Sequence, residues 1–183
     1  MNLGLAPEHR RWLAVYAIGL TGVLDLCLTG GIAWLAVRHQ PHIPLWQGIS
    51  ASRAGLLTDT VGTFFFLPFL TTLLLSPGVR AAQRGGELPR IRSDTTARDL
   101  ASHLPERLVR RGLYLGLITM IIASAVAVPV LFLAVGNGLS RAEFVVYKGV
   151  LAFGLGLVIA PLVALCAMTD DAKAGDAVAA QDS

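Results

Sequence analysis

The sequence predicts an all-α integral membrane protein with four transmembrane helices in two antiparallel hairpins and both termini in the cytoplasm. Three observations predict this fold. Hydrophobic residues make up 54% of the 183-residue chain and charged residues only 15%, which is too apolar for an ordinary soluble domain. Four stretches reach the length of about 20 apolar residues that crosses a hydrocarbon core. An arginine-rich segment, residues 77–111, separates the second stretch from the third.

The first predicted span covers residues 12–37. It is too long for the apolar part of a signal peptide and no clear cleavage site follows it, so we expect it to remain in the mature protein. Trp12 and Tyr16 at one end and Trp34 at the other are aromatic anchors of the kind that lie at membrane interfaces. The next segment, residues 38–54, is rich in proline and turn residues and is expected to lie outside the membrane.

The second predicted span, residues 55–76, is followed by Pro77 and Gly78, which we expect to end the helix. Pro68 inside the span should kink it, because proline removes a backbone hydrogen bond. The arginine-rich segment then begins as a loop, in which residues 95–103 are predicted to form a short surface helix.

The third predicted span, residues 112–135, belongs to a helix expected to begin near Pro105 and Glu106. A Gly-Asn-Gly turn ends it and forces an antiparallel hairpin with the fourth span, residues 144–168. The tail, residues 170–183, is alanine-rich and polar and is expected to be mobile, because it has little apolar surface to bury. The whole chain is treated as one four-helix membrane domain.

The distribution of basic residues predicts the orientation. Ten arginines lie in the amino terminus and the central loop: Arg10, Arg11, Arg80, Arg84, Arg90, Arg92, Arg98, Arg107, Arg110 and Arg111. Only Arg38, Arg53 and Arg141 lie in the opposite loops. Because basic loops stay in the cytoplasm, we expect a multi-pass protein of the cell inner (cytoplasmic) membrane. Basic residues gathered in one loop, rather than on a folded face, do not indicate nucleic-acid binding.

Three ionisable residues lie within the predicted spans: Asp25, Asp59 and Lys148. Each costs about 2.5 to 3.5 kcal/mol on insertion scales, so such residues usually face protein or a wet cavity. Asp25 lies on one helical face with Thr21 and Thr29. Two interpretations stay open: a structural carboxyl that is protonated or hydrogen-bonded to these threonines, or a group that binds a proton or a cation.

The second span carries a similar small and polar stripe, formed by Gly55, Asp59, Gly62 and Thr63. Matching stripes of small residues allow two helices to approach closely in lipid. We therefore expect the first two helices to pack against each other through these stripes.

Counting residues from the outer ends of the spans places Asp59 and Lys148 at the same depth, about 6 Å below the outer surface. Asp25 lies more than about 10 Å deeper and has no cationic partner at its level. We predict that Asp59 and Lys148 form a structural ion pair where the two hairpins meet. The alternative is that Lys148 extends to the outer headgroups on its long side chain.

Other motifs give weaker indications. Arg107, Arg110 and Arg111 are predicted to share a helical face near the headgroups, where they hold anionic lipid or only fix the topology. The pair His39 and His42 is an incomplete metal site, so no metal and no cofactor is predicted. The two cysteines, Cys27 and Cys166, are interpreted as small core residues.

The functional hypothesis that follows is a small homo-oligomeric transporter or channel for an ion or small solute, with Asp25 as its binding group. The alternative is a non-catalytic structural or accessory subunit that binds a membrane-protein partner. An enzyme is the third choice, because no catalytic motif is present. The expected partners are the lipid bilayer and a second copy of the chain or another membrane protein.

Overall fold

The computed structural model describes residues 11–46, 55–86, 104–105 and 107–179. It is mostly helical, and three of its helices are long and apolar enough to cross a membrane. These are α3 (Leu56–Arg84), α5 (Leu108–Val135) and the Arg141–Thr169 part of α6 (Arg141–Ala179). A further apolar helix, α2 (Thr21–Val37), has 17 residues and continues directly from a π-helical segment, η1 (Leu13–Leu20).

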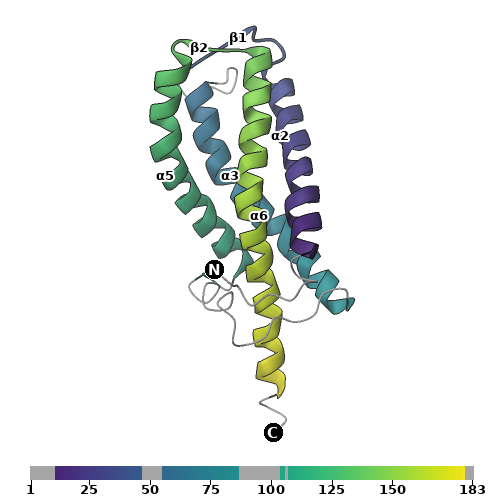
Figure 1. Ribbon diagram of the computed structural model, residues 1–183. Helices are drawn as coiled ribbons and strands as arrows, with labels where there is room; N and C mark the ends of the chain where they lie inside the picture. Colours follow the sequence, from purple (N-terminus) through teal and green to yellow (C-terminus); the bar gives the residue numbers. More distant parts are fainter. Residues whose placement is uncertain (1–10, 47–54, 87–103, 106, 180–183) are drawn as a thin grey trace.

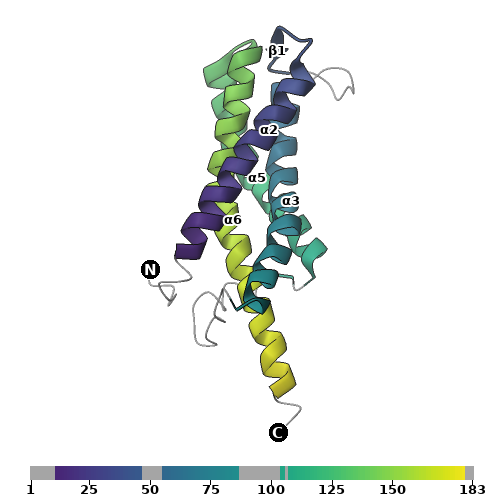
Figure 2. The ribbon, with the colours of Figure 1, turned by 90° about the vertical axis from the view of Figure 1, so that its right-hand side faces the viewer.

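The helices run side by side, and two short strands lie at one end of the bundle (Figure 1). The segment η1 begins, and α6 ends, towards the opposite end (Figures 1 and 2). Helix α6 is central because it packs against both α2 and α3, while α5 packs against α3. Each helix satisfies its own backbone hydrogen bonds, which is the condition for a segment to lie in lipid.

The neighbour of α2 differs from the prediction. Helix α2 packs mainly against α6, so the expectation that the first two helices pack through their small stripes is wrong. The reason is that glycines on both α6 and α2 allow these two helices to approach closely. A Cβ atom added to Gly156 would lie 3.0 Å from Oδ2 of Asp25, and one added to Gly22 would lie 3.2 Å from the ring of Phe153.

Close packing of glycine on aromatic residues also joins α5 to α3. A Cβ atom added to Gly112 would lie 2.9 Å from the ring of Phe69, and one added to Gly116 would lie 2.7 Å from the backbone oxygen of Phe65. The rings of Phe65 and Phe69 are stacked, with centroids 6.1 Å apart. These glycines let α5 approach α3 as closely as small residues allow in membrane helices.

The loop after α2 and the loop after α5 are joined by a small sheet that the sequence did not predict. Strand β1 (His42–Pro44) pairs with β2 (Gly138–Ser140) in antiparallel register, with Ile43 opposite Leu139. Ile43 is fully buried among residues of α2, α3, α5 and α6. Gly138 has a φ of 137°, which other residues rarely adopt, so glycine is required at this strand end.

The C-terminal end of α3 also differs from the prediction. Pro77 and Gly78 do not stop the helix, which continues to Arg84 and ends at Gly85. Packing against α6 explains this, because Val79 is fully buried beside Ala164 and Met168. In addition, the side-chain amide of Gln83 donates to the backbone oxygen of Met168 at 3.2 Å. Tertiary contacts thus outweigh the lost hydrogen bond at proline.

The start of α5 and the end of α6 also differ from their predicted positions. Helix α5 begins at Leu108, later than expected, because Arg107 has an extended backbone. Helix α6 continues to Ala179, so most of the tail predicted to be mobile is helical. An alanine-rich segment that extends an existing helix has no nucleation cost. The surface helix predicted for residues 95–103 and the final residues 180–183 lie outside the described residues.

The two cysteines differ in their environments. Cys166 is buried as expected, whereas Cys27 is exposed on α2. Because α2 packs mainly against α6, ten of its 17 residues are exposed, and Cys27 is one of these. The expectation that both cysteines are core residues is therefore wrong for Cys27.

The close contact at Gly116 gives a stability prediction. Replacing Gly116 by alanine should lower the free energy of unfolding in detergent by about 1–3 kcal/mol, because the new methyl group meets backbone that cannot move aside. Gly154 of α6 is the matched control, since a Cβ atom there meets nothing within 4 Å. Gly154→Ala should be neutral or stabilising. Equal losses for both variants in a thermal or denaturant titration would contradict the packing of α5 on α3.

Candidate functional site

A groove with a volume of about 860 Å³ lies between α2 and α3, and Lys148 of α6 contributes to its wall. Its lining is mostly apolar, with large side chains from both helices. All three ionisable residues predicted within the spans, Asp25, Asp59 and Lys148, line it. The groove exists because α2 packs on α6 instead of on α3. The small stripe of α3, including Gly62 and Thr63, therefore lines an open space.

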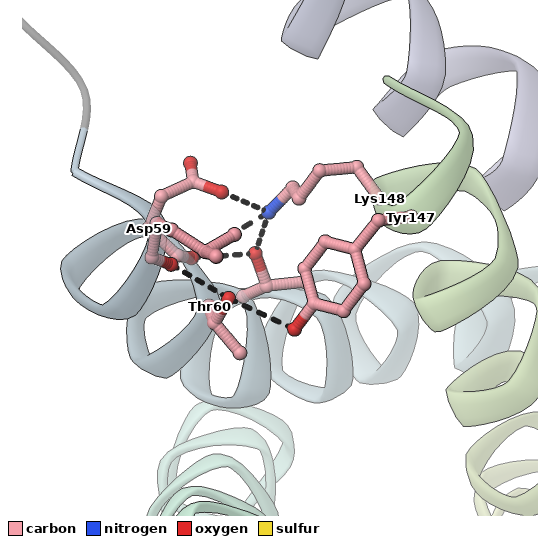
Figure 3. A network of polar contacts seen from close by, with 6 residues as sticks. Asp59, Thr60, Tyr147 and Lys148 are labelled. Carbon is pink, nitrogen blue, oxygen red and sulfur yellow. Dashed lines mark hydrogen bonds and ion pairs between the residues drawn. The ribbon is translucent and has the colours of Figure 1, made fainter. Parts of the chain in front are cut away.

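The structure brings Asp59 and Lys148 together as an ion pair. The Nζ atom of Lys148 lies 2.6 Å from Oδ2 of Asp59, and Figure 3 shows the lysine reaching from α6 to α3. The ammonium group also donates to the Thr63 hydroxyl and, at 3.5 Å, to the backbone oxygen of Asp59. Only 4% of Lys148 is exposed, so its charge is held by protein groups and does not extend to the headgroups.

A second contact between the same two helices lies next to the ion pair. The Thr60 hydroxyl and the Tyr147 hydroxyl are 3.0 Å apart, and Thr60 also donates to the backbone oxygen of Leu56 at 2.7 Å (Figure 3). The sequence reasoning missed both residues. The signal was available, because Thr60 and Tyr147 directly neighbour Asp59 and Lys148, and the same depth count places them within about 3 Å of each other in depth.

Asp25 lies on the opposite wall of the groove and has no ion pair among the described residues. Its Oδ2 atom is buried and accepts no hydrogen bond from them, including from Thr21 and Thr29. Both threonines nevertheless line the groove beside it. Oδ2 faces Gly156, which lies two helical turns beyond Lys148, about 12 Å along α6. Asp25 is therefore deeper than the ion pair.

The three arginines predicted near the headgroups do not share one face. Arg107 precedes α5 and Arg110 is exposed, whereas Arg111 is only 1% exposed. The Nε atom of Arg111 donates to the backbone oxygen of Pro105 at 3.1 Å. The prediction of a shared face is wrong, because the helix begins after Arg107 and turns Arg111 into the bundle.

Metal chemistry has no support in the part of the chain that the structure describes. No group of three histidine, cysteine or acidic side chains is close enough there to hold a metal ion. His39 and His42 are both exposed, and the Nε2 atom of His42 lies 3.4 Å from the backbone oxygen of Asn137.

Comparison with protein families, curated proteins and solved structures finds no match to this chain. The functional argument therefore depends on the groove and its ionisable residues.

The ion pair gives a prediction for a double-mutant cycle. Asp59→Asn and Lys148→Met should each lower the free energy of unfolding in detergent, because each leaves the other charge without a counter-ion in an apolar environment. The double variant should lose less than the sum, with a coupling energy of about 1 kcal/mol or more.

Ser124 of α5 provides the control for this cycle, since it takes no part in the ion-pair network. The effects of Asp59→Asn and Ser124→Ala on the free energy of unfolding should be additive. Additive losses for Asp59 and Lys148 as well would show that the pair contributes no interaction energy.

Proposed function

We propose that this chain is a four-span protein of the inner membrane that moves an ion or small solute along the groove between α2 and α3. The observation that carries the proposal is Asp25, an acidic residue without a hydrogen-bond partner or counter-ion among the described residues, in the wall of an 860 Å³ groove. Burying a carboxyl in this way is costly, and in membrane proteins such residues usually mark ion or substrate routes.

Four spans follow if η1 and α2 act as one membrane crossing. The 17 residues of α2 extend over about 26 Å, and the π-helical turns of η1 add to this length. Together they are long enough to cross a hydrocarbon core of about 30 Å. The basic residues of the amino terminus and the central segment then favour a cytoplasmic location for both termini.

A second copy of the chain would close the groove. The large side chains that line it are half-exposed in a single chain, as Leu28 at 60% and Leu74 at 72% show. A route for a polar solute must be shielded from lipid, so we propose a homo-oligomer as the transporting form. Of the three arginines, Arg107 and Arg110 are exposed and remain the proposed contacts for anionic lipid headgroups.

The second candidate is an accessory subunit of a membrane complex. The outward side of α2 favours it, because Gly31 is exposed and a Cβ atom at Gly30 or Gly31 would meet nothing within 4 Å. Small residues on an outer helix face suit close packing with a partner helix. A native mass of the protein extracted with its lipids separates the two candidates, since a homo-oligomer gives whole multiples of the 19.4 kDa chain.

The transport proposal predicts that Asp25→Asn abolishes proton-coupled solute flux in proteoliposomes while the protein stays folded. Asparagine keeps the shape of the side chain and removes its charge, so the loss would report on ion binding and not on packing. Ser124→Ala of α5 is the control, because it removes a polar group outside the groove lining and should leave flux unchanged. Unchanged flux in folded Asp25→Asn protein would exclude Asp25 as the binding group.

A further inference from the structure

The side chains that line the groove indicate which kind of ligand it can bind. Six large apolar side chains line it, and each is between 48% and 72% exposed: Leu24, Leu28, Ile32, Phe66, Leu70 and Leu74. Its volume of about 860 Å³ falls within the range of about 300–1,000 Å³ in which proteins bind drug-sized molecules. A fully hydrated ion would gain nothing from these walls. They favour a ligand with a large apolar body.

The charge of the groove is acidic once the ion pair is accounted for. Lys148 neutralises Asp59, because its ammonium group lies 2.6 Å from that carboxylate. Asp25 then remains as the acidic group in the lining that has no counter-ion among the described residues. A cation placed beside Asp25 would supply this missing partner. An anion would be repelled at the same point.

A bare metal cation fits the site less well than an organic cation. Small inorganic cations are bound by several oxygen ligands, about six to eight for calcium. Apart from the ion-pair network, the groove-lining side chains that carry oxygen are Asp25, Thr21, Thr29 and Thr71, and no three metal-ligating side chains cluster among the described residues. An organic cation needs only one carboxylate, and an aromatic face such as that of Phe66 can add a cation–π contact.

We propose that the groove between α2 and α3 binds a hydrophobic organic cation, whose charge pairs with Asp25 and whose apolar body lies along the leucine and phenylalanine side chains of the two helices. This inference rests on the proposed function and specifies its substrate class. The ligand is a free molecule that dissolves in the bilayer. The amine of a lipid headgroup stays near the surface, whereas Asp25 lies twelve residues from the end of α2, about 18 Å below it.

Two probes of the same shape and opposite charge test the proposal on the unmodified protein. Radiolabelled tetraphenylphosphonium, a cation, should bind the detergent-purified protein saturably, and tetraphenylborate, its anionic counterpart, should compete at least about tenfold more weakly. This comparison does not depend on the folding of any variant. Absence of saturable cation binding, or equal competition by the anion, would overturn the proposal.

Variants then locate the site. Asp25→Asn should weaken tetraphenylphosphonium binding about tenfold or more, because it removes the counter-ion and keeps the shape. Cys27→Ala is the matched control on the same helix, since Cys27 is exposed and does not line the groove. It should bind like the unmodified protein. Unchanged binding in Asp25→Asn would show that the cation binds elsewhere and would overturn the assignment.

A binding measurement in lipid nanodiscs distinguishes a free organic cation from the amine of a lipid headgroup. In nanodiscs of phosphatidylglycerol, which has no amine, the affinity for tetraphenylphosphonium should not change when phosphatidylethanolamine is added. Displacement by that lipid would assign the site to a headgroup and overturn the proposal. The outcomes also separate this inference from transport. Cation binding without flux would remove only the transport proposal, and flux without cation binding would remove only the substrate class.

Discussion

The placement of a charged lysine in an apolar layer is the constraint on which the rest of this structure depends. Lys148 lies on the central helix and is almost fully buried, so its ammonium group requires an acidic partner from a neighbouring helix. Asp59 of α3 supplies it, and the Thr63 hydroxyl completes the contact. The pair fixes α6 against α3 near the strand end of the bundle. It also removes the charge of Asp59 from the groove and leaves that of Asp25.

Small residues determine which helices become neighbours. In lipid there is little hydrophobic driving force between helices, so close backbone approach decides the packing. Helix α6 presents Gly149 and Gly156 to α2, where a Cβ atom would lie 3.7 Å from Leu26 and 3.0 Å from Asp25, respectively. Helix α5 presents its glycines to α3 instead. Because α2 packs against α6, it does not cover the polar stripe of α3. The groove is the direct consequence of this arrangement.

The features that follow from length and depth could be predicted from the sequence. The apolar helices appear where continuous apolar runs predict them, and counting residues from the outer ends brought Asp59 and Lys148 to one level, where the structure has their contact. Both depend on a fixed rise along each helix. The depth of a residue along its own helix does not determine which neighbouring helix that residue contacts. For that reason the sequence predicted that the polar stripe of α2 around Asp25 packs against α3, whereas α2 packs against α6.

The features that depend on tertiary contacts could not be predicted. Pro77 lies inside α3 because Val79 and Gln83 beyond it contact α6, and no local signal reports these contacts. The pairing of β1 with β2 joins loops that lie about a hundred residues apart in the sequence, as His42 and Ser140 do. Arg111 resembles its exposed neighbours in sequence, but α5 begins only after Arg107 and Arg111 is buried. In the first two cases, a partner distant in sequence decides the local structure.

The transport proposal requires that water enter the groove between α2 and α3, whereas the outward surface of α5 would face lipid. Charged thiol reagents measure this, because a cysteine reacts with them only where water reaches it. In a background without Cys27 and Cys166, a cysteine at Leu70 in the groove should react at least about tenfold faster than one at Ile122, an exposed residue at similar depth on α5. Equal and slow labelling at the two positions would contradict the account.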